Sequence, residues 1–167
     1  SGTLGIAAAI FGPAMGVRKI LGTGRDRKLL QEVKALAPSR IEVFSIDDGS
    51  VTDFVMKHTD GEGVDAFLDC LGPGALHETF LQGLRGLRRG GIAVDIGAVM
   101  GPVAIDVHWL MDHNQRLYGS AWFTTQEGQE MADLVAAGAV DLSMLETQGR
   151  KLSEVNEAIS GIAQRHG

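Results

Sequence analysis

The chain has 167 residues and a formal net charge of −6, and 44% of its residues are hydrophobic and 22% charged. These values are typical of one folded domain with a full hydrophobic core, and the negative charge gives a nucleic-acid partner little electrostatic support. No apolar run approaches the ~20 residues that a membrane-spanning helix needs. The single cysteine, Cys70, excludes an internal disulfide and a multi-cysteine metal site.

Apolar runs alternate with segments of helical period along the whole chain. Predicted helices cover residues 6–15, 27–37, 51–58, 76–87, 108–113, 126–137 and 152–164. Predicted strands cover residues 18–23, 41–46, 64–71, 92–98 and 117–123, with a further short edge strand at 103–106. This order predicts an α/β fold, with a doubly wound parallel sheet of the Rossmann type and helices on both faces.

The first residues match the latter part of a G-x-G-x-x-G phosphate loop; they are Ser1, Gly2, Thr3, Leu4 and Gly5. Gly2 would let the backbone approach a pyrophosphate, and the following helix would offer free N–H groups to the phosphates. A plain loop at a helix start is the alternative. The strand expected before such a loop is missing from the sequence, so we expect the first strand to belong to a longer polypeptide.

The end of the second strand of such a fold contacts the adenosine ribose of the cofactor. Gly24 occupies this position, where NAD-binding domains carry an acidic residue, and Arg25 and Lys28 follow it. These two cations would pair with the 2′-phosphate of NADP, although Asp26 would partly neutralise them. A solvated turn is the alternative interpretation, and NAD is the alternative cofactor.

Six motifs resemble, in order, those of the medium-chain dehydrogenase/reductase superfamily, which includes the zinc-type alcohol dehydrogenases and the quinone-reductase-like proteins. They are the glycine loop at 1–5, G-E-G-V-D at 61–65, L-R-R-G-G at 87–91, G-A at 97–98, G-S-A-W-F at 119–123 and L-S-E-V-N-E-A at 152–158. The resemblance implies a dinucleotide-binding domain at 1–137. It also implies that 138–167 form a segment and helix that return toward a catalytic domain outside this chain.

The resemblance also implies cofactor contacts at the ends of three strands. These contacts would come from Leu71 and Gly72 at the nicotinamide ribose, from Gly97, Ala98 and Val99 beside the nicotinamide, and from the backbone of Ser120 and Trp122 at its carboxamide. The alternative is that these residues merely complete the upper edge of the sheet. The family further implies a homodimer joined through the edge segment 102–106.

Other chemically active residues are expected to have structural roles. Cys70 is predicted to be a core thiol, and the spacing of His108 and His113 does not suit a shared metal ion. Asp69 and Asp95 lie within predicted buried strands, so each needs a hydrogen-bonding partner, such as a loop backbone near the cofactor. We therefore predict no catalytic residue and no metal ligand in this chain, and any zinc would belong to the catalytic half.

These inferences predict an oxidoreductase that transfers a hydride between NADP(H) and an alcohol or carbonyl compound. A zinc-free quinone or enoyl reductase of the same superfamily and a non-catalytic nucleotide-binding protein are the alternatives. An S-adenosylmethionine methyltransferase fits less well, because it needs an acidic residue where this chain has Gly24. We expect a cytoplasmic protein with a small-molecule substrate and with neither a nucleic-acid nor a membrane partner.

Overall fold

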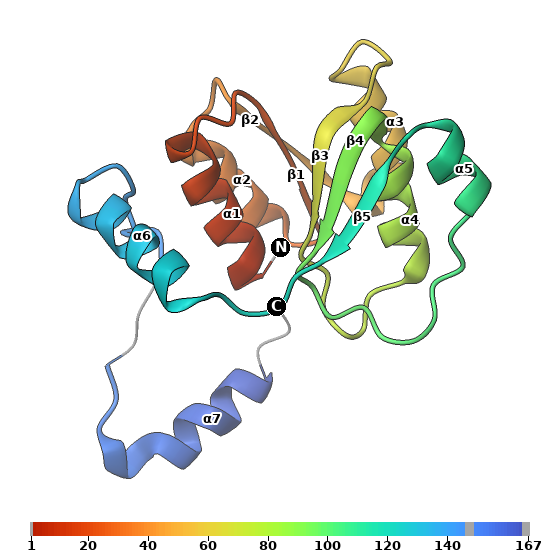
Figure 1. The fold of residues 1–167 in the computed structure, drawn as a ribbon. Coiled ribbons are helices and arrows are strands. Elements are labelled where there is room, and N and C mark those ends of the chain that lie inside the picture. Colours follow the sequence, from red (N-terminus) through yellow and green to blue (C-terminus); the bar gives the residue numbers. More distant parts are fainter. Residues whose placement is uncertain (1, 146–148, 165–167) are drawn as a thin grey trace.

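The computed structural model describes residues 2–145 and 149–164 and shows parallel strands flanked by helices (Figure 1), as predicted. The strands are β1 (Ile20–Gly24), β2 (Ile41–Ser45), β3 (Val64–Asp69), β4 (Leu87–Asp95) and β5 (Arg116–Gly119). The helices are α1 (Thr3–Ala14), α2 (Arg27–Leu36), α3 (Val51–Lys57), α4 (His77–Arg85), α5 (Val107–Asp112), α6 (Thr125–Ala136) and α7 (Val155–Gln164), with 3-10 turns at Ile46–Asp48 and Leu152–Glu154.

The strands form two separate sheets. One sheet pairs β1 with β2, and the other has the order β3-β4-β5, with every pair parallel. In a doubly wound sheet the first strand lies between the strands that correspond to β1 and β3. No strand among residues 2–145 and 149–164 occupies that place.

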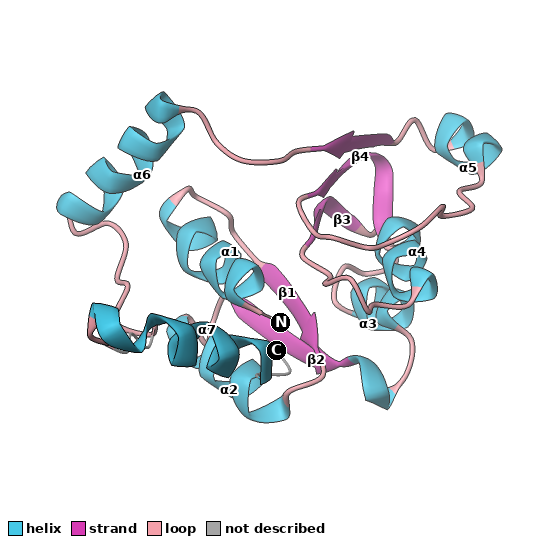
Figure 2. Cartoon of the chain, turned by 90° about the horizontal axis from the view of Figure 1, so that it is seen from below, coloured by secondary structure: helices cyan, strands magenta, loops and turns pink. Residues whose placement is uncertain are grey.

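Each sheet buries apolar side chains against its own helices. Ala9, Val33 and Ile41 form a cluster between α1, α2 and β2, and Phe80, Leu84, Leu87 and Ala93 form a second one between α4 and β4. In Figure 2, α1 and α2 accompany β1 and β2, whereas α3 and α4 lie beside β3 and β4. The core therefore lies between the strands and their helices, and it includes Ile41 and Leu87 at the amino ends of β2 and β4.

Two predicted boundaries were wrong: the end of the helix predicted at 76–87 and the start of the strand predicted at 92–98. The helix ends earlier, at a glycine, and the strand begins earlier. Helix α4 ends at Arg85 with Gly86 as its C-cap, so it does not extend to the Gly90–Gly91 pair. That pair lies inside β4, which begins at Leu87 and contains a register shift against β3. Gly90 has a φ of 76°, which is compatible with the irregular backbone at this shift.

The predicted edge strand at 103–106 is also absent: these residues form neither helix nor strand. Val103 and Ile105 instead pack against the cluster around Phe80. The alternation of apolar residues in this segment thus reflects one face packed on the core. It does not reflect pairing at the edge of a sheet.

The predicted strand at 117–123 is shorter than expected, because β5 ends at Gly119. Trp122 has a φ of 66°, in the left-handed region, where a strand cannot continue. Helix α6 follows on the far side of α1 and α2 from β5, and α7 lies below α1 and α2 in the view of Figure 1. None of the described helices combines the length and apolar character needed to cross a membrane.

Candidate functional site

The carboxyl ends of β3, β4 and β5 are joined by backbone hydrogen bonds. The Ala98 amide donates to the Leu71 carbonyl over 2.8 Å, and the Ser120 amide donates to the Asp95 carbonyl over 2.9 Å. The structure therefore brings together the three strand-end segments that were predicted to contact the nicotinamide end of a cofactor. In open α/β sheets this edge is where ligands bind.

Two aspartates fix the turns that follow β3 and β4. Asp69 Oδ1 accepts a hydrogen bond from the Leu71 amide (3.2 Å), and Asp95 Oδ1 accepts one from the Gly97 amide (2.9 Å). The expectation that these carboxyl groups bond to loop backbone is confirmed, although only Asp69 is buried and Asp95 is partly exposed. Burial raises the pKa of Asp69 to about 6, the Leu71 hydrogen bond opposes this rise, and the nearby Asp95 adds to it.

Gly97 lies where two loops approach closely. A Cβ atom at this position would lie 2.6 Å from the Leu71 carbonyl oxygen and 2.7 Å from Asp69 Oδ2. At Gly72, in contrast, a Cβ atom would meet nothing within 4 Å. Glycine at 97 is thus required by the packing of the protein itself, whereas Gly72 leaves open space beside the strand end.

Trp122 lies three residues after the end of β5, and its side chain is 93% exposed. Its left-handed backbone is unusual for a bulky residue and stores strain of roughly 1–3 kcal/mol. Strain of this kind is concentrated at functional sites, and the backbone contact expected from Trp122 stays a prediction. The sequence contained no signal for this conformation.

The proposed phosphate loop is largely helical, so its predicted extent was wrong. Helix α1 begins at Thr3, and Gly2 is its N-cap with no side-chain cap; Thr3, Leu4 and Gly5 therefore form the first turn, and Ser1 lies outside the described residues. The amides of a first turn have no partner within the helix. Figure 1 places the start of α1 close to the edge at which the strands end, so these amides are available to an anion there.

Gly24 is buried at the end of β1, and Arg25 and Lys28 follow it on the surface. Asp26 does not pair with either cation; it caps α2 by accepting a hydrogen bond from the Leu29 amide over 3.0 Å. Lys28 lies 3.6 Å from Glu32, one helical turn later. Arg25 has no carboxylate within ion-pair distance among the described residues, so its guanidinium group remains available to a ligand.

A pocket of about 190 Å³ has Arg25 in its wall. Its other lining residues are Ile46, Asp47, Gly49, Val51, Leu76, Glu78, Thr79 and Gln82. The pocket therefore joins the segments that follow β1, β2 and β3. Sequence reasoning had not included the later residues, because nothing in their spacing connects them with Arg25.

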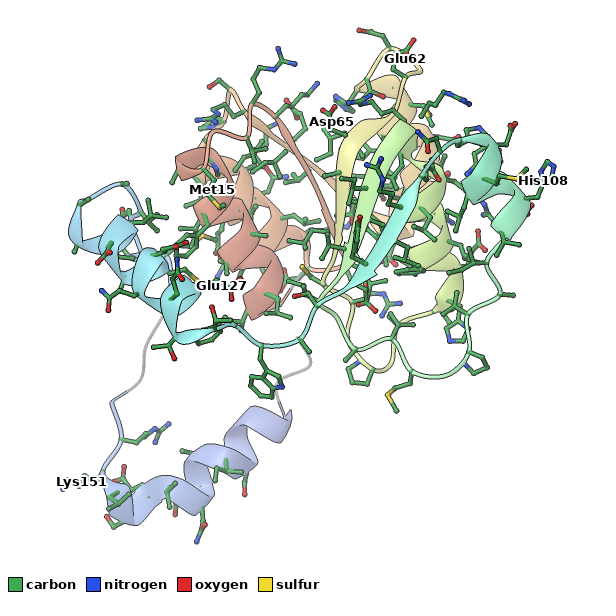
Figure 3. The ribbon with its side chains drawn as sticks, in the orientation of Figure 1. Met15, Glu62, Asp65, His108, Glu127 and Lys151 are labelled. Carbon is green, nitrogen blue, oxygen red and sulfur yellow. The ribbon has the colours of Figure 1, made fainter. Side chains whose placement is uncertain are left out.

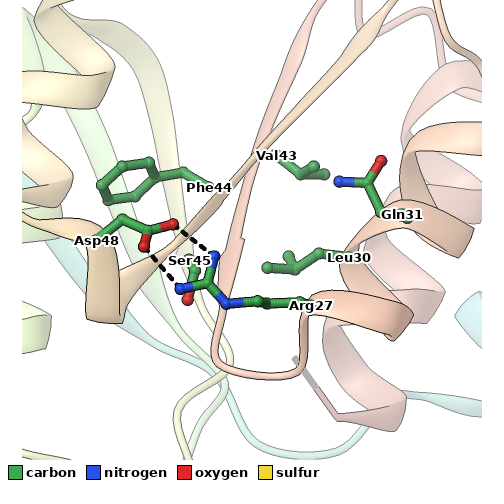
Figure 4. Close-up of a pocket in the computed structure, with 7 residues that line it drawn as sticks. All are labelled: Arg27, Leu30, Gln31, Val43, Phe44, Ser45 and Asp48. Carbon is green, nitrogen blue, oxygen red and sulfur yellow. Dashed lines mark hydrogen bonds and ion pairs between the residues drawn. The ribbon is translucent and has the colours of Figure 1, made fainter.

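A second pocket, of about 210 Å³, lies between β2 and the start of α2 (Figure 4). Arg27 and Asp48 form a bidentate ion pair at its rim, with N–O distances of 2.7 and 2.9 Å. This pair lowers the pKa of Asp48 and raises that of Arg27. Asp48 is not among the residues that the sequence predicted for a site, although the opposite charges of Arg27 and Asp48 follow neighbouring strands.

The remaining polar residues form no metal site among residues 2–145 and 149–164. His113 stacks on Trp109 with ring centroids 3.6 Å apart, and His108 lies on the outer side of α5 (Figure 3). Cys70 is partly buried next to Asp69, and burial raises the pKa of its thiol to about 11. These residues are therefore assigned no part in the site.

The sequence and the fold both match known proteins. A family described as zinc-binding dehydrogenase matches residues 3–137. An alcohol dehydrogenase of Cupriavidus necator is 29% identical over 99% of this chain and 45% of its own length. The chain thus spans about half the length of the curated relatives that it matches.

Two solved structures share the fold. A zinc-binding dehydrogenase of Sinorhizobium meliloti 1021, described as putative and as bound to NADP, has a TM-score of 0.82 at 21% identity over 95% of this chain and 46% of its own. A quinone oxidoreductase of Pseudomonas syringae pv. tomato DC3000 has a TM-score of 0.74 at 21% identity over 99% of this chain and 51% of its own.

Proposed function

Because the chain belongs to the zinc-binding dehydrogenase family, we propose that it is the dinucleotide-binding part of an NADP(H)-dependent oxidoreductase acting on an alcohol or carbonyl compound. One observation carries the proposal. The segments after β3, β4 and β5 are tied together at the carboxyl edge, where ligands bind in sheets of this kind. Arg25 after β1, which has no carboxylate partner in the described part of the chain, and the first-turn amides of α1 supply the groups that phosphates need.

The dinucleotide would supply the carbon that gives or takes a hydride, so this chain needs to bind and orient it. The first-turn amides of α1 would hold the pyrophosphate, and Arg25 would hold the 2′-phosphate. Leu71 and Gly72 would line the ribose, while the open space at Gly72 leaves room for it. The turns at 97–99 and 120–122 would then hold the nicotinamide ring and its carboxamide.

The choice of NADP over NAD rests on the position after β1. Gly24 offers no carboxylate to the ribose hydroxyls, and Asp26 is engaged as the cap of α2. The Sinorhizobium meliloti structure with the same fold is described as bound to NADP. A guanidinium group binds a phosphate in bidentate fashion, which favours Arg25 as the principal contact and Lys28 as the weaker one.

Replacing Arg25 with alanine tests this proposal. We expect the affinity of the full-length protein for NADPH to fall by roughly 1–3 kcal/mol, about fivefold to 150-fold, because a charged hydrogen bond is lost. The affinity for NADH should stay unchanged. Fluorescence titration at fixed ionic strength measures both, and Lys57→Ala, which removes an exposed cation on α3, is the matched control. Equal losses for both cofactors would contradict the assignment of Arg25, and binding of neither by the unaltered protein would contradict the function.

A quinone or enoyl reductase without zinc is the second candidate, and the fold shared with the Pseudomonas syringae quinone oxidoreductase favours it. The described residues include no group that could hold zinc, so any such ion would have ligands elsewhere in the polypeptide. Metal analysis of the full-length protein separates the two candidates. A stoichiometric zinc ion that is needed for alcohol oxidation supports the first.

We also make proposals about the parts of the protein that would contact this domain. We propose that a strand from another part of the polypeptide pairs with β1 and β3 and joins the two sheets, so that 1–137 forms one dinucleotide-binding domain. The segment 138–167 would lead to the catalytic domain, and the exposed Leu152 and Ile159 give it an apolar face for that contact.

We also propose a cytoplasmic homodimer. Val103 and Ile105 pack inward, so its interface would use apolar residues that face solvent, such as Val107 and Met111 of α5.

A further inference from the structure

Two aspartates occupy matching positions on neighbouring strands. Asp69 ends β3, Asp95 ends β4, and the two are register partners in the parallel ladder. Adjacent strands lie about 4.8 Å apart, so register partners project from the same face of the sheet. The next partner along the row is Gly119 on β5, which has no side chain. The two carboxyl groups are therefore each other's neighbours at this edge.

The pair has no cation to balance it. Asp69 is 1% exposed, and its Oδ2 atom is buried without a hydrogen-bond partner among the described residues. No lysine, arginine or histidine of residues 2–145 and 149–164 forms an ion pair with either carboxyl group.

The charged groups on the packed elements are occupied elsewhere. On α4, Glu78 pairs with Arg85 over 2.7 Å, and His77 bonds to the Met100 carbonyl. Asp106 caps α5, and the remaining nearby group is the thiol of Cys70, directly after β3. Asp69 is buried and Asp95 is partly buried beside it. Ionising both carboxyl groups at this distance without a compensating cation costs free energy, so one proton held between them is favoured.

The same two residues control the relative position of two loops. Each aspartate uses one oxygen to hold its own loop, at Leu71 and at Gly97. The remaining oxygen of Asp69 contacts the place where a Cβ atom of residue 97 would lie, at 2.7 Å. A hydrogen bond between the carboxyl groups would thus connect the loop at 71–72 to the loop at 97–99.

We propose that Asp69 and Asp95 are positioning residues that share one proton, and that this shared hydrogen bond sets the spacing of the loops that hold the nicotinamide half of the cofactor. The second half of this inference rests on the proposed function. Because burial raises the pKa of Asp69 to about 6, the proton is held below that pH and lost as the pH rises through it. Binding of the nicotinamide half should therefore weaken over the same range.

Asp69→Asn tests the shared proton in the full-length protein. An asparagine can accept the Leu71 hydrogen bond with its oxygen and donate to Asp95 with its NH₂ group, as the protonated acid does. The readout is the ratio of the Kd for NADPH to the Kd for 2′,5′-ADP, which carries the same phosphate but no nicotinamide; NADH and ADP replace them if the protein selects NADH. In the unaltered protein we expect this ratio to rise about tenfold between about pH 5 and pH 8. In Asp69→Asn it should stay constant.

Asp69→Ala separates positioning from a general structural role. Without any side-chain hydrogen bond, we expect NADPH binding to weaken about tenfold at about pH 5 while 2′,5′-ADP binding stays unchanged. A ratio that does not depend on pH in the unaltered protein, or the same dependence in Asp69→Asn, would overturn the shared proton. Equal losses for both ligands in Asp69→Ala would overturn the positioning role. Failure of the unaltered protein to bind either ligand would instead reject the proposed function.

Discussion

Gly97→Ala should destabilise the protein by about 3 kcal/mol, because overpacking at a close backbone contact forces the surrounding structure to move. The added methyl group would lie 2.6 Å from the Leu71 oxygen, 2.7 Å from Asp69 Oδ2 and 2.9 Å from the Leu71 nitrogen. Two of these three atoms belong to the backbone, so a rotamer change cannot relieve the contact. Guanidinium unfolding with an unchanged m-value measures the loss.

Gly72→Ala is the matched control, because it adds the same methyl group to the neighbouring loop. Nothing lies within 4 Å of the place that this methyl group would take, and Gly72 has no left-handed backbone. We expect its free energy of unfolding to change by no more than about 0.5 kcal/mol. Similar values for both variants would mean that the loops at 71–72 and 97–99 do not approach each other as described.

Phe80→Ala should cost about 3–5 kcal/mol, the range for removing a large buried aromatic side chain. Phe80 is 5% exposed and lies with Leu84, Leu87 and Ala93 in the cluster beneath the carboxyl ends of β3 and β4. Its ring centroid is 5.8 Å from that of Phe67 on β3, so truncation leaves a cavity between α4 and the sheet.

The control for Phe80 is Phe123→Ala, which removes a ring that is 65% exposed. Its effect should stay within about 0.5 kcal/mol. Urea or guanidinium unfolding compares the two variants, and Phe80→Leu replaces the alanine variant if that protein does not accumulate. A loss at Phe123 that equals the loss at Phe80 would contradict the assignment of the core.

Periodicity predicted the helices and strands well where burial dictates the pattern. The spacing of Leu30 and Val33 became the buried face of α2, and the run V-D-A-F-L-D became β3, although Asp69 is the one buried residue of that strand. The same pattern misled at Val103 and Ile105, because alternation shows that one face is covered without showing what covers it. In so short a segment, packing against a helix and pairing at the edge of a sheet give the same alternation of apolar and polar residues.

The candidate site was predictable to the extent that strand ends define it. Leu71, Ala98 and Ser120 come together because the carboxyl ends of parallel strands meet at one edge. The partners of the charges were not predictable, because they depend on three-dimensional proximity. Asp26 caps α2, so Arg25 has no carboxylate partner among the described residues. Arg27 pairs with Asp48, which lies in the turn after β2.

The separation of the five strands into two sheets is explained by the pairing of backbone groups. The hydrogen-bonding edges of β1 and β3 face no partner strand among the described residues. Backbone groups at the centre of a sheet require pairing, so an additional strand would complete both ladders.

Hydrogen–deuterium exchange of the full-length protein with and without NADPH tests the central claim most directly, namely that the carboxyl edge of the strands binds a nicotinamide dinucleotide. We predict slower exchange on binding in five segments, 2–5, 24–28, 71–72, 97–99 and 120–122, because each contributes backbone or a neighbouring side chain to the proposed site. The opposite edge of the sheet, at 61–63 and 86–90, should exchange unchanged. Protection confined to that opposite edge, or no protection at saturating NADPH and NADH, would contradict the account.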